Sequence, residues 1–73
     1  VENISAAVSR LRTLDLQKPP GVAEAIDWVH AAVLLGVHTL DADAVGRTLG
    51  SVLKYREDHD VASEAGLAWV AGA

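Results

Sequence analysis

Apolar residues recur every three or four positions along most of the chain, which is the spacing of one face of a helix. Four stretches show this spacing. They predict helices at residues 4–14, from residues 20–22 to about residue 35, at residues 42–57 and at residues 61–71. No stretch alternates apolar and polar residues with a period of two, so we expect no strand. The apolar faces are Ile4, Ala7, Val8, Leu11 and Leu14; Val22, Ile26, Val29 and Val33; Val45, Leu49, Val52 and Leu53, with Arg56; and Val61, Ala65, Ala68 and Trp69.

Residues that start or stop helices support these boundaries. Asn3 and Asp41 are good N-caps for the first and third helices, and Asp43 adds charge to a first turn. The segment of residues 18–21, Lys-Pro-Pro-Gly, cannot lie inside a helix, although proline is accepted in a first turn. Gly36 is a suitable stop for the second helix. The pattern therefore predicts an all-α fold, a small four-helix bundle with short connections.

Two glycines fall within the third predicted helix. Gly46 and Gly50 are four residues apart, and each weakens a helix by about 1 kcal/mol relative to alanine. We expect them where another helix packs closely against this one.

The length and composition indicate one small domain, residues 1–73, with a thin core. Hydrophobic residues make up 51% of the chain, but many of them are alanines, and the aromatic residues are only Trp28, Tyr55 and Trp69. A core of this size often needs a neighbouring surface to cover it.

The charge balance argues against nucleic acid as a partner, since ten acidic and six basic residues give a net charge of −4. The chain has no cysteine, which is typical of a cytoplasmic protein. Its longest apolar run, residues 29–37, contains His30 and is too short to span a membrane. The first ten residues lack the basic start and apolar run of a signal peptide.

The sequence offers little for catalysis or metal binding. His30, His38 and His59 are too far apart in sequence to form a helical metal-binding pair. Residues 58–60, Asp-His-Asp, could hold a cation, but a solvated helix-capping turn is the simpler interpretation. No serine lies in a pattern that would activate it, and no glycine-rich phosphate loop is present. We therefore expect no catalytic residue, no metal site and no enzymatic activity of this chain alone.

The start of the second helix admits two interpretations. Free amides, the helix dipole and Lys18 meet there, and this combination favours an anion such as phosphate. Alternatively, Pro19 and Pro20 simply make a stiff start for the helix and Lys18 is exposed.

Most of the chain, residues 8–60, resembles the C-terminal helical lid of MoxR-type AAA+ ATPases. The resemblance is most specific in a lysine-proline-proline segment followed by Val-Ala-Glu and an Ile-Asp-Trp helix, and later positions are generic. The matching residues are Leu16, Lys18, Pro19, Pro20, Val22, Ala23, Glu24, Ile26, Asp27 and Trp28, followed by Leu40, Asp41, Thr48, Leu49, Gly50, Leu53 and Lys54, with Asp58 or Asp60 closing the match.

The resemblance implies a nucleotide-facing role for residues 18–22. In these ATPases the nucleotide lies between a large α/β domain and the lid, whose second helix begins with a basic "sensor 2" element. The usual arginine is absent here, because Pro20 or Gly21 holds its place. Lys18 is the nearest cation that could substitute, with Pro19, Pro20, Gly21 and Val22 supplying the backbone near the nucleotide. Trp28 would pack within the bundle or against the large domain.

The resemblance also implies partners that the residues alone do not indicate. Residues 1–73 would be a lid fragment without the Walker A and Walker B motifs, so ATP and Mg would be bound by the parent protein. That parent would be an ATPase, typically a hexamer, that remodels partner enzymes or helps to insert their metal cofactors, often with a von Willebrand A-domain protein. Glu24 and Asp27 could meet basic residues of a neighbouring subunit, or be ordinary surface carboxylates.

A second hypothesis is a free-standing helical module that binds a protein through an exposed apolar groove. The alanine-rich last helix would suit groove binding or self-association. A helix-turn-helix is disfavoured, because no candidate recognition helix is basic.

Overall fold

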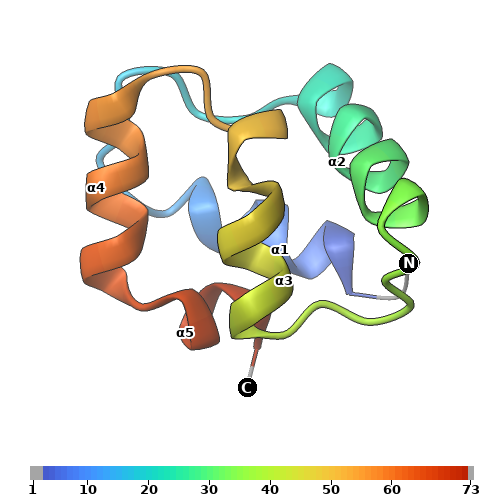
Figure 1. Cartoon of the computed structure of the whole chain (residues 1–73). Coiled ribbons are helices and arrows are strands. Elements are labelled where there is room, and N and C mark those ends of the chain that lie inside the picture. The colour runs from blue at the N-terminus through green and yellow to red at the C-terminus, as the bar shows by residue number, and fades with distance from the viewer. Residues whose placement is uncertain (1–2, 73) are drawn as a thin grey trace.

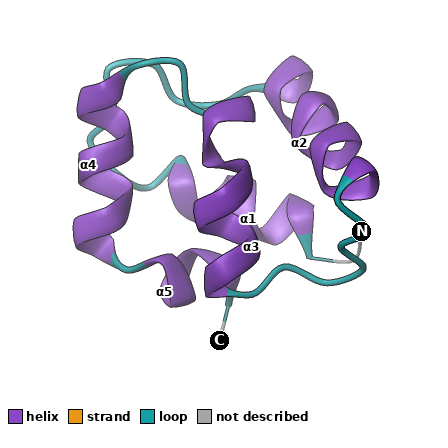
Figure 2. Cartoon of the chain, viewed as in Figure 1, coloured by secondary structure: helices purple, strands orange, loops and turns teal. Residues whose placement is uncertain are grey.

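The computed structural model describes residues 3–72, and these residues form helices and loops with no strand. The prediction of an all-α fold is confirmed (Figures 1 and 2). Five α-helices are present among them instead of the predicted four. They are α1 (Ile4–Leu11), α2 (Val22–Leu34), α3 (Ala42–Thr48), α4 (Arg56–Ala65) and α5 (Leu67–Ala71), and a 3-10 turn, η1 (Leu49–Ser51), follows α3.

The first helix ends at Leu11, three residues earlier than predicted. The chain tightens there, because the amides of Thr13 and Leu14 donate to the carbonyls of Arg10 and Leu11, three residues back. The Thr13 hydroxyl also donates to the Arg10 carbonyl (2.7 Å). Leu14 nevertheless packs against the core from this turn.

The third predicted helix, residues 42–57, is broken in the structure. α3 ends at Thr48, η1 follows, and Tyr55 is extended (φ −107°, ψ 140°) before α4 begins at Arg56. The physical reason is that Gly46 and Gly50 lower helix propensity. In addition, Glu57 and Asp58 favour a new helix N-terminus, where carboxylates interact well with the dipole.

The fourth predicted helix also divides, at Gly66, where φ is +107°. Glycine adopts this conformation without the steric cost that a Cβ atom would impose. The break turns α5, so that Val70 and Ala71 are buried, whereas Ala65, Ala68 and Trp69 are exposed. Of the predicted apolar face of this segment, Val61 does pack against the core, but the prediction is wrong for the other three residues. Arg56 is likewise exposed at the start of α4.

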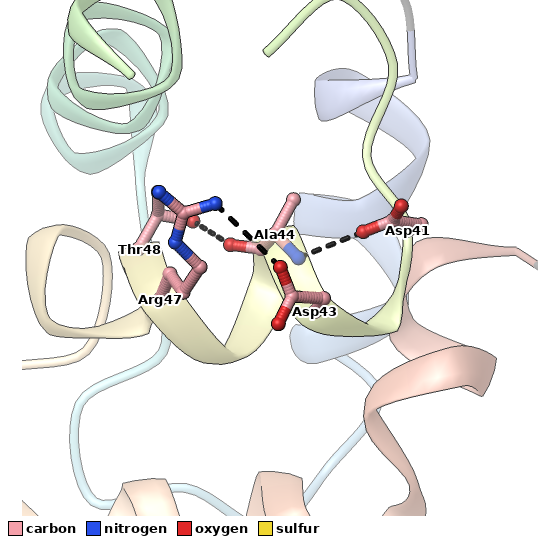
Figure 3. Close-up of polar contacts among 5 residues, drawn as sticks. All are labelled: Asp41, Asp43, Ala44, Arg47 and Thr48. Atoms are coloured by element: carbon pink, nitrogen blue, oxygen red, sulfur yellow. Dashed lines mark hydrogen bonds and ion pairs between the residues drawn. The ribbon is translucent and has the colours of Figure 1, made fainter. Parts of the chain in front are cut away.

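Other helix ends agree with prediction. α2 begins just after Gly21, and Gly36 has φ +73° just past its end. Asp41 caps α3 by accepting from the Ala44 amide (2.8 Å), and Asp43 pairs with Arg47 one turn on (3.6 Å), as Figure 3 shows. The predicted cap by Asn3 is wrong: this residue stands at the N-cap position, but its side chain bonds Leu40 and Ala71 instead of capping α1.

Trp28 is fully buried and is the largest of the fully buried side chains. Its indole Nε1 donates to the Thr48 hydroxyl (2.6 Å), which in turn donates to the Ala44 carbonyl (2.7 Å), the second bond being drawn in Figure 3. The remaining buried hydrophobic residues are Ile4, Ala7, Val8, Leu11, Leu16, Ala32, Leu40, Ala44, Val45, Leu49, Val52, Leu53, Ala62, Val70 and Ala71. The core thus joins all five helices around one large side chain.

One of the two glycines marks a close helix contact, as predicted. A Cβ atom on Gly46 would lie 3.2 Å from Leu67 Cδ1 of α5, which is tighter than ordinary packing. Gly50 differs, because it is exposed in η1 and a Cβ atom there would meet only the His59 ring at 4.0 Å.

Three of the four residues in the predicted apolar stripe of α2 face outward, whereas the fourth, Val29, is partly buried against the core. Val22 is 79% exposed, Ile26 51% and Val33 61%, and only Trp28 and Ala32 of this helix are buried. α2 therefore packs on the core through Trp28, Val29 and alanine side chains, and leaves Val22, Ile26 and Val33 at the surface.

Candidate functional site

The segment that leads into α2, residues 17–21 (here named the proline segment), is tied to α4 by one carboxylate. Asp58 Oδ1 accepts from the Gln17 amide at 2.7 Å, and Asp58 Oδ2 accepts from the Lys18 amide at 3.0 Å. Asp58 is 1% exposed, although it lies forty residues further along the chain. A third bond between the same segments joins Gln17 Nε2 to Glu57 Oε2 (3.2 Å).

The proline segment explains why a carboxylate belongs at this position. Pro19 and Pro20 have no amide hydrogen, so Gln17 and Lys18 carry the last two donors before the prolines. The two oxygens of Asp58 accept one bond each from these donors. Hydrogen bonds to a charged acceptor are stronger than neutral ones, and their net contribution is about 1.5–3 kcal/mol. The expected solvated turn at residues 58–60 is therefore wrong for Asp58, whose oxygens are both occupied.

The residues predicted to face a nucleotide occupy a continuous stretch with mixed exposure. Lys18 and Pro19 are exposed, Pro20 is buried, Gly21 is half-buried and Val22 is exposed. Pro20 anchors the segment in the protein, and Asp58 fixes the backbone of Lys18. The lysine side chain is consequently carried on a fixed backbone at the surface.

Glu24 reaches back over the start of α2. Its Oε1 accepts from the Gly21 amide at 2.8 Å, and the first intrahelical bond runs from the Ala25 amide to the Gly21 carbonyl. A carboxylate at this position stabilises the helix N-terminus. It also disfavours a second anion at the Gly21 amide, whose hydrogen is already bonded.

Two further charged residues flank α2. Lys54 Nζ lies 4.0 Å from Asp27 Oδ2, an exposed pair within the chain. Arg12 Nη1 donates to the Pro20 carbonyl at 3.4 Å, which links the end of α1 to the proline segment. Asp27 therefore has a basic partner within its own domain.

A groove of about 650 Å³ runs between α1 and α2. We name it the α1–α2 groove. Its apolar walls are formed by Ile4 and Val8 of α1 and by Val22, Ala25, Ile26 and Val29 of α2. Ser5, Ser9 and Arg12 contribute the polar atoms of its α1 side. The exposure of Val22 and Ile26 shows that the groove is open to solvent.

The histidines and acidic residues do not assemble a metal site in the part of the chain that the structure describes. Residues 3–72 contain no group of three or more His, Asp or Glu side chains placed to hold an ion. His59 instead bonds the Leu53 carbonyl through Nε2 (2.8 Å), next to the break between η1 and α4. Nor is any helix of the described residues long and apolar enough to cross a membrane.

Sequence reasoning identified the proline segment but missed the residues that hold it. No local sequence pattern indicated that Asp58 holds the proline segment, because its partners are amides about forty residues away. Arg12, which bonds the proline segment, was not singled out, and the bond between Thr48 and Trp28 was not predicted. The double proline was the one available hint, since the amides before it need an acceptor.

No protein-family model matches the sequence, and comparison with curated proteins and with solved structures yields no match.

Proposed function

We propose that this chain is the helical lid of a MoxR-type AAA+ ATPase and that it closes over a nucleotide held by a separate α/β domain. The observation that carries the proposal is the anchored proline segment, in which a buried carboxylate fixes the backbone before α2 and leaves Lys18 at the surface. A sensor element needs this arrangement, because a cation stabilises the negative charge of a bound phosphate effectively only when the position of the cation is fixed.

In this proposal the chain supplies one cation and a shaped surface. Lys18 would approach the phosphates of the nucleotide, with the exposed Pro19 and Val22 beside it. The α/β domain would supply the magnesium ion and the hydrolysis of ATP. Asp58 holds the proline segment in place, and Glu24 keeps the Gly21 amide occupied, so that the anion contact falls to Lys18.

The wider role follows the same resemblance. As a lid, the chain would move with the nucleotide state and pass that motion to neighbouring subunits of a hexameric ring. The ring would remodel partner enzymes or help to insert their metal cofactors, together with a von Willebrand A-domain protein. Glu24 and Asp27 already have partners within the chain, so contacts to a neighbouring subunit would use other residues.

The proposal is tested by adding the chain to the α/β domain of a MoxR-type ATPase that lacks its own lid. We expect the chain to tighten Mg-ADP binding by roughly 5-fold or more, the lower end of typical coupling between sites. Isothermal titration calorimetry with and without the chain measures this difference. Lys18→Gln should remove most of the gain.

Lys54→Gln is the matched control, since Lys54 is an exposed cation whose partner is Asp27. This variant should leave the gain in Mg-ADP affinity unchanged. Equal affinity with and without a large excess of the chain would overturn the lid proposal.

A second candidate is a free-standing module that binds a protein partner, and the open α1–α2 groove favours it. The two proposals make different predictions for the effect of nucleotide on binding. A lid alters Mg-ADP affinity through Lys18, whereas a free-standing module binds its partner equally well without nucleotide.

A further inference from the structure

The α1–α2 groove lies beside the surface from which Lys18 would contact a nucleotide, and the two share Gly21 and Val22. Its α1 wall runs from Ile4 to Arg12 and its α2 wall from Gly21 to Val29. Each wall covers eight residue steps, which at 1.5 Å per residue is about 12 Å, or roughly two helical turns. The groove therefore matches about two turns of a partner helix with apolar residues at positions i, i+3 or i+4, and i+7.

The walls favour a helix over an extended peptide. Both are α-helices, in which most backbone donors and acceptors are bonded within the helix. An extended peptide needs an open row of backbone partners, as at the edge of a sheet, whereas a helix already satisfies its own backbone groups. An aliphatic face is the part of such a helix that Ile4, Val8, Val22 and Ile26 can cover.

The position of Arg12 at one end of the groove predicts the orientation of the partner helix. Arg12 is the charged residue of the groove lining, and it stands at the end of α1 where the proline segment passes. A guanidinium has five N–H donors, and among the described residues Arg12 uses Nη1 in one 3.4 Å bond to Pro20. The remaining donors suit a carboxylate, which binds a guanidinium in a planar, two-point contact.

We infer that the α1–α2 groove binds an amphipathic helix of a partner protein, with aliphatic anchors over about two turns and a carboxylate at the Arg12 end. The inference rests on the groove lining, its length and its charge. It deepens the second candidate function, a module that binds a protein partner, and does not depend on the nucleotide contact proposed for Lys18. A two-turn contact is smaller than a standard protein interface, so binding is expected to be weak, with a Kd of roughly 0.1 mM.

The test uses two dye-labelled, alanine-based peptides of roughly 15 residues, long enough to be partly helical. Both carry leucines at positions i, i+4 and i+7, and they differ only in having a glutamate or a lysine at the end that would meet Arg12. Fluorescence anisotropy with the 73-residue chain measures binding. We expect the glutamate peptide to bind about 5-fold or more tightly than the lysine peptide.

Variants locate the binding surface. Ile26→Glu places a charge in the groove and should weaken the glutamate peptide more than about 10-fold. Val33→Glu is the matched control, because Val33 lies on the same helix, is similarly exposed and does not line the groove. Arg12→Glu should reverse the preference between the two peptides. Circular dichroism establishes that each variant remains folded, as expected for exposed positions.

Several results would overturn the inference. They are no binding of either peptide at about 2 mM chain, an equal loss of binding in Ile26→Glu and Val33→Glu, and an unchanged peptide preference in Arg12→Glu. Self-association detected by sedimentation equilibrium and abolished by Ile26→Glu would also overturn it, since the occupant would then be a second copy of the chain. If the chain does not alter the Mg-ADP affinity of the α/β domain, the peptide measurements are unaffected. Either proposal can therefore fail without the other.

Discussion

Replacing Asp58 with asparagine is expected to lower the free energy of unfolding by about 2–3 kcal/mol. Asparagine keeps the shape of the side chain but offers one acceptor oxygen, so either Gln17 or Lys18 loses its acceptor and faces an amino group instead. Asp58 is almost fully buried, which limits replacement of the lost bond by water. A domain of this length has a total stability of about 4–11 kcal/mol, so the loss is a large fraction.

Urea unfolding followed by circular dichroism measures this loss. Asp60→Asn is the matched control, because Asp60 is an exposed carboxylate in the same helix and its change should stay within about 0.5 kcal/mol. Amide exchange gives a second reading, since the Lys18 amide should exchange faster in Asp58→Asn. Equal stability of the two variants would contradict the role of Asp58 in holding the proline segment.

Replacing Trp28 with alanine is expected to cost about 3–5 kcal/mol, the largest effect of any single substitution considered. Trp28 is fully buried in the core, and its removal leaves a cavity. The substitution also removes the donor that bonds the Thr48 hydroxyl. Against a total stability of about 4–11 kcal/mol, this loss is at least about a quarter, so the variant should unfold at a much lower temperature.

The second tryptophan provides the comparison. Trp69 is 41% exposed on α5, so Trp69→Ala should cost about 1 kcal/mol or less. Thermal unfolding of the two variants, followed by circular dichroism, distinguishes them. A larger loss for Trp69→Ala than for Trp28→Ala would mean that the core is centred on the last helix instead of α2.

The helical class and several helix ends could be predicted from the sequence because their causes are local. Asp41 caps α3, and Gly36 follows α2, through interactions that span only a few residues. The proline segment was also placed correctly, because proline excludes helix interior whatever surrounds it. These features depend on the chain near each residue.

The sequence-based predictions failed where contacts between residues far apart in sequence determine the structure. The predicted apolar stripe of α2 supplies little of its packing, because Trp28 and Ala32 are buried in the core while Val22 and Ile26 remain outside. Periodicity shows that α2 has an apolar face. It does not show that the side of the helix carrying Trp28 is the side that becomes buried. Asp58 was missed for a similar reason, since its partners are the amides of Gln17 and Lys18.

The outward stripe of α2 and the anchored proline segment lie next to each other in the chain, with Val22 belonging to both the groove lining and the predicted nucleotide-facing residues. A partner helix in the groove would thus lie close to the surface from which Lys18 projects. This proximity makes the start of α2 the part of the molecule on which most of the proposed function depends.

The most direct test is a two-dimensional NMR spectrum of the labelled chain, recorded with the α/β domain of a MoxR-type ATPase in the presence and absence of Mg-ADP. The lid proposal predicts that adding Mg-ADP to the mixture causes saturable shifts at the amides of Lys18, Gly21 and Val22. These are the amides closest to the nucleotide in that proposal. Shifts confined to α4 and α5, or no nucleotide-dependent shift at saturating α/β domain, would contradict it.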